Sequence, residues 1–335
     1  MEIGIDTFVT SHAVGNGESD ETAIRHLLDR IKFADELGLH VYGIGEHYSK
    51  DKLDSSTSVL LSAAAAITEN IRLTSAVSGV GTCDPVKLYQ DFATIDLISN
   101  GRAEIVAGRG ASVEAWSLFG LKIEESTEIF IEKLKLLLQI RDNEFVNWKG
   151  KHRSPIENMG IYPRAKQKTL PIWHAALRTP ASAIRAGELG MPLMLAVIDG
   201  QIEQSRSLVE LYREAGLDAG YDEDELMIGF HSMGYVAETT EQAIEEFYPG
   251  WAEAMSKLHS SPKSRTRFDI DLKASGSSLL VGNPQEVAEK IKYISKTFGG
   301  ISRFCFQMDY TGLPHEKLMK SIELIGKEVI PIVNG

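Results

Sequence analysis

A histidine follows a short strand-like run that contains two glycines. The run Gly43-Ile44-Gly45 leads through Glu46 into His47. Because side chains alternate along a strand, His47 shares a face with both glycines, which leave room for a flat ligand beside the imidazole. Imidazole exchanges protons near neutral pH, so we expect His47 to act as a catalytic acid or base. A histidine that only forms a hydrogen bond at a strand end would give the same pattern.

An arginine stands at the end of a later strand-like run, in the sequence Gly108-Arg109-Gly110. The flanking glycines expose its guanidinium, whose planar fork suits a phosphate group. We therefore expect Arg109 to bind an anion. The alternative is an ion pair with one of the many carboxylates of the chain.

The next strand-like run ends in Arg178-Thr179-Pro180, with Ser182 shortly after. Threonine before proline is typical of a helix start, because the threonine caps the helix and proline suits its first position. Backbone N–H groups at such a start, together with hydroxyls and Arg178, can bind an anion, although an ordinary helix cap has the same pattern. Since this run follows the one that ends at Arg109, we expect both ends to hold one phosphorylated cofactor.

The sequence lacks the motifs of several other kinds of functional site. No HxH or HExxH pattern links the histidines, so we expect no metal site. Gly79-Val80-Gly81 lacks the strand–GxGxxG–helix context of a dinucleotide site, and neither a Walker sequence nor a GxSxG elbow occurs. The two cysteines, Cys83 and Cys305, provide neither a disulfide framework nor metal-ligand spacing.

Predicted strands and helices alternate along the chain, and these elements must position the candidate residues. Eight short runs rich in Ile, Val, Phe and Tyr predict strands. They span Glu2–Val9, Val41–Glu46, Ile71–Val77, Ala103–Ala107, Pro171–Ala176, Pro192–Val197, Leu226–Val236 and Ile301–Gln307.

Segments with helical spacing separate most of these strands. One carries Leu27, Ile31 and Ala34 on one stripe and ends at Gly38, and another begins at Pro284. This alternation predicts a parallel sheet covered by helices, and eight units favour an α/β fold of the (β/α)8 TIM-barrel type. Active sites of such barrels lie where the strands end, and the candidate residues lie there too.

Two insertions account for the residues beyond the about 250 that a barrel needs. Residues 142–164 predict a hairpin before strand five. Residues 247–278 are rich in Ser, Lys and Gly and predict a long, mobile, lid-like loop after strand seven. We expect residues 1–335 to form a single barrel domain with these two additions.

The composition of the chain disfavours some classes of binding partner. The 335 residues include 47 acidic and 35 basic side chains, for a net charge of −12. This excess disfavours nucleic acid and anionic membranes as partners. The N-terminus lacks the pattern of a signal peptide, and no apolar run reaches the roughly 20 residues of a membrane span. We expect a cytoplasmic protein.

Several segments together resemble the bacterial luciferase-like flavin monooxygenases, over nearly the whole chain. They are the opening MEIGIDTF, the pair Glu46-His47, the run IRLTSAVSGVGTCDPVKLYQDFATIDLISNGRAEIVAGRG and the C-terminal VGNPQEVAEKIKYISKTFGG. Their order and spacing are similar to that family. Tyr48 replaces the second histidine of the family's EHH motif, and Asp84 replaces the histidine before its proline.

This resemblance implies a barrel that binds FMN and uses it in reduced form with O2. His47 would then be the catalytic histidine and Arg109 would hold the flavin phosphate, helped by the hydroxyls of Thr179 and Ser182. Arg178 stands where luciferase has a glutamate, so it would add positive charge.

The resemblance also implies a cofactor-binding surface on the barrel wall. A non-proline cis peptide would lie under the flavin in strand three, at Ser75-Ala76. Gly108, where luciferase has a cysteine, and Ala176 would also lie at the cofactor.

The implied reaction is oxygenation of a small organic substrate through a flavin hydroperoxide. The reduced FMN would come from a separate NAD(P)H:flavin reductase, and the protein would be a homodimer. Three alternatives remain open. They are an F420-dependent hydride-transfer enzyme of the same superfamily, a non-catalytic flavin-binding protein, and a metal-independent lyase or isomerase that binds a phosphorylated substrate at Arg109.

Overall fold

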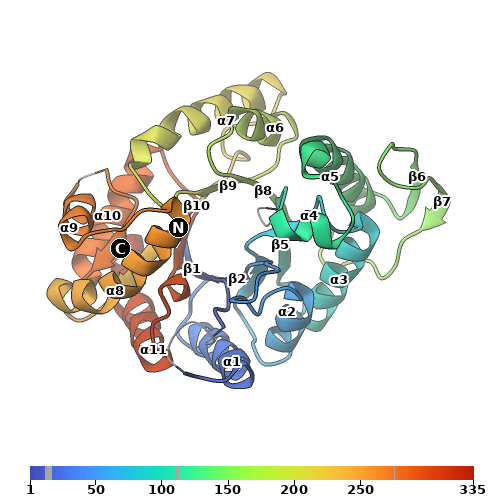
Figure 1. The fold of residues 1–335 in the computed structure, drawn as a ribbon. Coiled ribbons are helices and arrows are strands. Elements are labelled where there is room, and N and C mark those ends of the chain that lie inside the picture. Colours follow the sequence, from blue (N-terminus) through green and yellow to red (C-terminus); the bar gives the residue numbers. More distant parts are fainter. Residues whose placement is uncertain (12–16, 111–112, 275) are drawn as a thin grey trace.

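The computed structural model describes residues 1–11, 17–110, 113–274 and 276–335. Within these residues eight parallel strands close into a TIM-barrel-like ring, seen along its axis in Figure 1. Each strand pairs with the next, and the last pairs with the first. In ring order they are β1 (Glu2–Thr7), β2 (Val41–Ile44), β3 (Arg72–Ser75), β5 (Ala103–Gly108), β8 (Ile172–Ala176), β9 (Leu193–Ala196), β10 (Ile228–Val236) and β12 (Arg303–Gln307). The predicted fold is confirmed, and each strand overlaps a predicted run.

Short additional strands extend this ring. β4 (Ser78–Gly79) pairs with β5, and β11 (Leu280–Gly282) pairs with β10. β6 (Phe145–Trp148) and β7 (Ile156–Gly160) form an antiparallel hairpin outside the barrel. The hairpin predicted before the fifth barrel strand is therefore confirmed.

Helices surround the barrel and cover its outer face (Figure 1). Their ends follow local signals: the Ser19 hydroxyl accepts a hydrogen bond from the Thr22 N–H at the start of the first helix, and Gly38 follows its end with a φ of 76°. The helices are α1 (Asp20–Glu36), α2 (Thr57–Ala65), α3 (Pro85–Ile98), α4 (Val113–Leu118), α5 (Ser126–Asp142), α6 (Pro180–Glu188), α7 (Arg206–Asp218), α8 (Thr240–His259), α9 (Arg265–Lys273), α10 (Pro284–Thr297), α11 (His315–Leu324) and α12 (Ile330–Asn334). No helix in the described ranges is both long and apolar enough to cross a bilayer.

The two faces of the strands differ in chemistry. Side chains that face the helices, such as Ile3, Ile5 and Leu73, belong to the main hydrophobic core. The interior of the barrel instead holds a smaller apolar cluster around Trp173, together with buried Asp6 and Arg303. Alternation along each strand therefore separates a packed outer layer from a polar interior.

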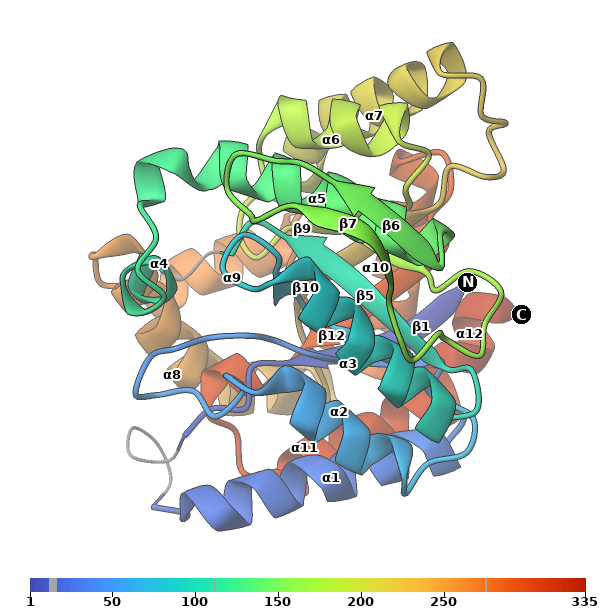
Figure 2. The same cartoon turned by 90° about the vertical axis from the view of Figure 1, so that its right-hand side faces the viewer.

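The two ends of the barrel have different roles. Figure 2 shows both termini at the end of the barrel opposite to α4. They lie side by side, since the Met1 amino group donates a hydrogen bond to Asn334 Oδ1 at 3.0 Å. The other end carries the connections that follow the strands, among them α4 after β5, and it is the end where barrel enzymes place their sites.

Residues 247–278 are largely helical, so the prediction of a loop there is wrong. They comprise the C-terminal part of α8, all of α9 and the connections around them. Phe247, Trp251 and Met255 recur every fourth residue and are buried, and Trp251 packs edge-on against Phe268 of α9 at 4.9 Å. The Ser- and Lys-rich composition of the connections obscured this helical stripe. The mobility of the segment stays a prediction.

Candidate functional site

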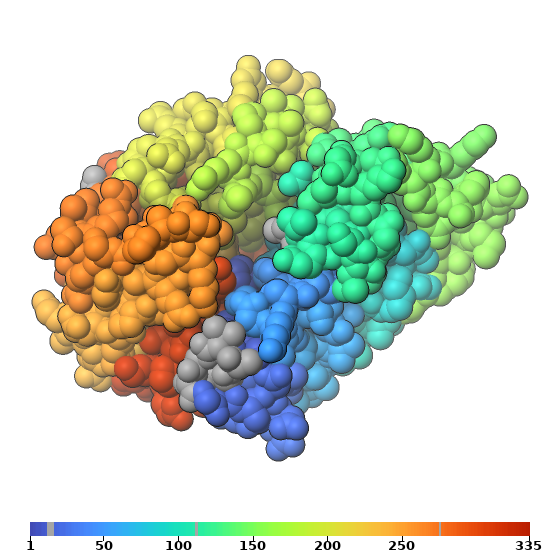
Figure 3. All heavy atoms as spheres, viewed as in Figure 1, coloured from blue at the N-terminus to red at the C-terminus, as the bar shows by residue number. Residues whose placement is uncertain are grey.

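The mouth of the barrel is open. In the space-filling view the molecule is hollowed at the centre of this face, between the orange atoms of the α8–α9 segment, the green atoms around α4 and the blue segment after β2 (Figure 3). Side chains that follow the carboxyl ends of several strands meet there.

His47 lies at this mouth, three residues after β2. Its Nδ1 is 2.8 Å from Asp54 Oδ2, and its backbone N–H donates to Asp54 Oδ1 at 3.0 Å. The Asp54 side chain is fully buried, whereas the His47 side chain is 27% exposed. Burial raises the pKa of the Asp54 carboxyl, and the hydrogen bonds with His47 oppose that rise. Sequence reasoning missed Asp54, because no motif marks a partner seven residues ahead in a connection.

Close packing fixes the His47 ring. A Cβ atom on Gly45 would lie 2.6 Å from Asp54 Oδ2 and 3.0 Å from His47 Cε1, so only glycine fits beside this pair. The Phe8 ring also packs here: its centroid lies 4.6 Å from that of His47, and the same Cβ atom would lie 2.8 Å from Phe8 Cδ1. The glycine that suggested space for a ligand therefore makes space for the histidine's own partner.

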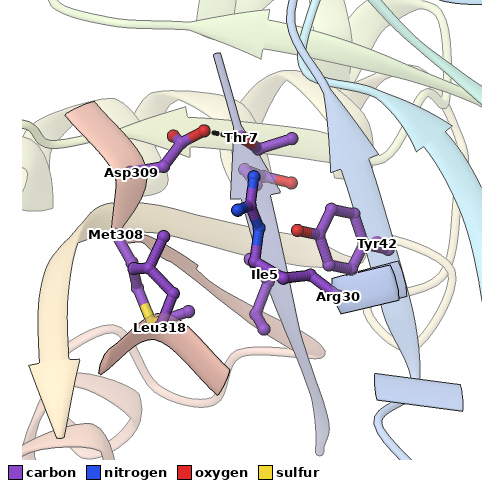
Figure 4. A pocket seen from close by; sticks show the side chains of 8 residues that line it. Ile5, Thr7, Arg30, Tyr42, Met308, Asp309 and Leu318 are labelled. Atoms are coloured by element: carbon purple, nitrogen blue, oxygen red, sulfur yellow. Dashed lines mark hydrogen bonds between the residues drawn. The ribbon is translucent and has the colours of Figure 1, made fainter. Parts of the chain in front are cut away.

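Phe8 is in turn held by a carboxylate from the far end of the chain. Asp309 accepts hydrogen bonds from the backbone N–H groups of Phe8 and Val9 at 3.1 Å each, and from the Thr7 hydroxyl. Figure 4 shows Asp309 and Thr7 at a small cavity into which Arg30 extends from α1. This cavity lies between β1 and the outer helices α1 and α11, beside the barrel mouth.

A second histidine–carboxylate pair lies inside the barrel. His231 Nδ1 of β10 is 2.6 Å from Asp6 Oδ2 of β1, and both side chains are buried. The other oxygen, Asp6 Oδ1, occupies the space that a Cβ atom of Gly43 would need. In the described part of the chain Asp6 Oδ1 has no hydrogen-bond partner. A buried carboxylate oxygen of this kind fits a hydrogen-bond donor bound in the barrel.

Glu46 and Tyr48 flank His47. The Tyr48 hydroxyl donates to Glu46 Oε1 at 2.9 Å, and burial raises the pKa of the Glu46 carboxyl. Tyr48 also packs edge-on against Phe119, with ring centroids 5.2 Å apart. The residue that replaces the family's second histidine thus connects β2 to the end of α4.

Arg109 lies where the sequence predicted, exposed just beyond β5. Its Nη1 donates to Ser126 Oγ at the start of α5, at 3.4 Å. Gly110 follows with a φ of 95°, and buried Trp116 of α4 packs beneath this turn, against Gly81. Among the described residues the guanidinium therefore has this one long hydrogen bond, and it can bind an anion.

Arg178 follows β8, the strand next to β5, but an acidic residue holds it. Its Nη2 lies 2.5 Å from Asp199 Oδ1, and the other oxygen of Asp199 lies 2.8 Å from His259 Nε2 at the end of α8. Thr179 is the N-cap residue of α6, yet its side chain makes no capping bond. Within the described residues no protein group hydrogen-bonds to the hydroxyls of Thr179 or Ser182, which leaves them for a ligand.

The cis peptide of the third strand requires a correction. It joins Ala76 to Val77, one bond later than the predicted Ser75-Ala76. Ser75 is still part of the sheet: its hydroxyl accepts from the Val106 N–H at 3.0 Å, and its side chain is buried. Val77 then packs against Gly108, where a Cβ atom would lie 2.5 Å from Val77 Cγ2. Gly108 therefore makes room for the chain after the cis bond.

Ala176 lies at the end of β8, but its side chain belongs to the outer hydrophobic core. Ala175 is instead packed beside the interior cluster around Trp173. Only the backbone of Ala176 can therefore face a ligand in the barrel.

These features fit a flavin. Two glycines bring carboxylates to the wall of the mouth, because Asp6 Oδ1 and Asp54 Oδ2 occupy the positions where Cβ atoms of Gly43 and Gly45 would lie. Ser78 Oγ and Asp6 Oδ1 are buried polar atoms without partners among the described residues, and the ring of a flavin offers both donors and acceptors. The same residues do not suit a metal, since no group of three or more His, Cys, Asp or Glu side chains in the described ranges could hold one.

Comparison with known proteins supports this interpretation. Residues 1–299 match the family described as luciferase-like monooxygenase. The chain belongs to this family. This flavin-dependent monooxygenase family also includes the oxygenase component of a flavin-dependent trigonelline monooxygenase from Acinetobacter baylyi, 23% identical over 97% of this chain and 94% of that protein.

Solved structures of related proteins have the same fold. Monooxygenase RslO1 from Streptomyces bottropensis superposes with a TM-score of 0.86 at 27% identity and covers 99% of both chains. The oxygenating constituent of 3,6-diketocamphane monooxygenase from Pseudomonas putida, in complex with FMN, gives 0.78 at 21% identity over 99% of this luciferase-like chain and 98% of that one. F420-dependent enzymes are also structural neighbours.

Proposed function

We propose that this luciferase-like protein is an oxygenase that uses reduced FMN and O2 to oxygenate a small organic substrate. The observation that carries the proposal is His47, which Asp54 and Phe8 hold in place and which is partly exposed at the barrel mouth. Residues 1–299 of the chain match the luciferase-like monooxygenase family. When bound, reduced FMN would supply the electrons that activate O2, and one oxygen atom would enter the product while the other leaves as water.

The rim residues would bind the cofactor by its phosphate. Arg109 would supply the charge, and the hydroxyls of Thr179 and Ser182 with the first N–H groups of α6 would supply hydrogen bonds. Arg178 would join them only after leaving Asp199. The ring system would lie in the mouth near Asp6 Oδ1 and Ser78 Oγ, which could form hydrogen bonds with it.

His47 would then move a proton at its Nε2. Asp54 occupies Nδ1, so Nε2 is the ring nitrogen left to face a ligand in the mouth. A positioned acid or base of this kind typically contributes 10²–10⁴-fold in rate. Around it the rings of Phe8, Tyr48 and Phe119 would form an apolar part of the mouth.

A separate flavin reductase would supply the reduced FMN. The support is that the trigonelline relative is the oxygenase component of its system. The absence of a dinucleotide motif in this sequence points in the same direction.

The test combines cofactor titration with oxygen consumption. Reduced FMN and reduced F420 are titrated anaerobically into the protein, and each complex is then mixed with O2 and a panel of small ketones, aromatics and sulfur compounds. We expect tight binding of reduced FMN and O2 consumption in proportion to oxygenated product, and an about 10²-fold or greater loss of turnover in His47→Gln with FMN still bound. Binding of F420 alone, with hydride transfer and no use of O2, would instead establish the F420-dependent alternative.

A further inference from the structure

Asp54 makes two contacts with a single residue. One carboxylate oxygen accepts the backbone N–H of His47 at 3.0 Å, and the other lies 2.8 Å from Nδ1 of the same histidine. A carboxylate that only fixed the connection after β2 would need the first contact alone. The second contact reaches the imidazole, and it therefore bears on which ring nitrogen carries the proton.

The surroundings hold Asp54 in place for this contact. Its side chain is fully buried, and the Thr57 hydroxyl links the backbone carbonyls of Asp54 and Gly45, at 3.0 and 2.5 Å. Gly45 lacks the Cβ atom that would collide with the carboxylate. Strand β2, the start of α2 and this carboxylate are thus joined into one unit around the histidine.

Only one position of the imidazole proton is consistent with an ionised Asp54 beside a neutral His47. An ionised carboxylate only accepts hydrogen bonds, so a neutral His47 beside it must carry its proton on Nδ1. Nε2 is then an acceptor that has no hydrogen-bond partner among the described residues, and the His47 side chain is partly exposed, so Nε2 is available to a ligand. Histidines that bind metals are oriented by carboxylates in the same way, and loss of the carboxylate there typically costs 10–100-fold in function.

We propose that Asp54 is the positioning residue of His47: it holds the imidazole in the Nδ1–H tautomer and directs Nε2 into the mouth of the barrel. The role of this tautomer in turnover rests on the proposed function. The orientation of the ring itself does not, and it can be measured without cofactor or substrate.

The decisive measurement is the tautomer of His47 in the cofactor-free protein. Protein labelled with ¹⁵N-histidine is studied by long-range ¹H–¹⁵N NMR above pH 8, and His47→Gln identifies the His47 signals. We expect Nδ1–H in the wild type. In Asp54→Asn the amide can donate to Nδ1, and in Asp54→Ala no acceptor remains, so we expect both variants to shift toward Nε2–H, the form that free imidazole side chains prefer.

Asp51→Asn is the matched control. It removes the same charge from the same connection, but Asp51 is about half exposed and contacts Ser49 instead of His47. The control should keep the wild-type tautomer. An unchanged Nδ1–H population in both Asp54 variants would overturn the proposal. Since Asp54→Asn is nearly isosteric, amide spectra of the two Asn variants show whether either has lost its fold.

Turnover separates the failure of this inference from that of the proposed function. If both are correct, Asp54→Asn lowers kcat by at least about 10-fold and leaves KM within about 3-fold. A shifted tautomer with full turnover in both Asp54→Asn and His47→Gln would leave the positioning role intact and remove the catalytic role of His47. An unshifted tautomer together with an inactive His47→Gln variant would leave the catalytic role of His47 intact and remove the positioning role of Asp54.

Discussion

Arg303 of β12 and Glu104 of β5 form an ion pair across the interior of the barrel. Arg303 Nη2 is 3.2 Å from Glu104 Oε2, and Arg303 Nη1 also donates to Glu104 Oε1. Both side chains are only 2% exposed. The centroid of the Trp173 ring, which belongs to the apolar cluster in the barrel interior, lies 4.4 Å from the guanidinium carbon. Because β5 and β12 lie on opposite sides of the ring, this pair connects walls that share no backbone hydrogen bonds.

Replacing Glu104 should therefore destabilise the fold strongly. In Glu104→Gln the Arg303 charge stays buried and keeps Glu2 as its one carboxylate partner among the described residues. The free energy of unfolding should therefore fall by about 3 kcal/mol, as measured by urea denaturation. Glu253→Gln is the control, because Glu253 pairs with Lys257 on the exposed face of α8 and its loss should cost less than about 0.5 kcal/mol. Equal losses in the two variants would contradict the assigned role.

Arg109→Ala should weaken FMN selectively. If the guanidinium binds the phosphate, the Kd of FMN should rise about 10–100-fold, while the Kd of riboflavin, which has no phosphate, stays within about 3-fold. Fluorescence titration of each flavin measures both constants. Arg206→Ala is the control, since Arg206 is exposed and pairs with Glu210 on α7. A parallel loss for both flavins would refute phosphate binding by Arg109.

Asp199→Asn should have the opposite effect and strengthen FMN binding. The Asp199 carboxylate now holds Arg178, and a bound phosphate would compete with it for that guanidinium. Removal of the negative charge should therefore lower the Kd of FMN about 2–5-fold, a size typical of exposed ion pairs, and leave riboflavin unchanged. Glu210→Gln removes a charge at a distance from the mouth and should change neither Kd. Weaker FMN binding in Asp199→Asn would show that Arg178 takes no part in binding the phosphate.

The sequence predicted the barrel well because its signals are local. Most strands are short apolar runs, and helix limits such as Ser19 and Gly38 are set by hydrogen bonds and backbone angles within a few residues. The α8–α9 segment was misjudged because the buried stripe from Phe247 to Met255 lies next to polar connections, and composition outweighed periodicity.

The site was predicted only in part, because its decisive contacts are between residues distant in sequence. His47 and Arg109 follow their strands as expected, but the partner of Arg178 comes from the next connection and is shared with His259 of α8. The pair of Asp6 and His231 spans 225 positions. Only closure of the barrel brings such residues together, and no spacing rule encodes it.

His174 should make stability depend on pH. It lies on the outer face of β8, fully buried against Phe130, and burial lowers its pKa from 6.5 to about 4. Between these values the unfolded chain binds a proton that the folded protein excludes, so the free energy of unfolding should fall by up to about 3 kcal/mol as the pH drops from 6.5 to 4. His174→Leu should remove this part of the pH dependence in denaturant titrations at several pH values. Phe130→Leu, which loses the same ring contact but no titrating group, should lower stability equally at each pH. A wild-type slope in His174→Leu would show that another group binds the proton.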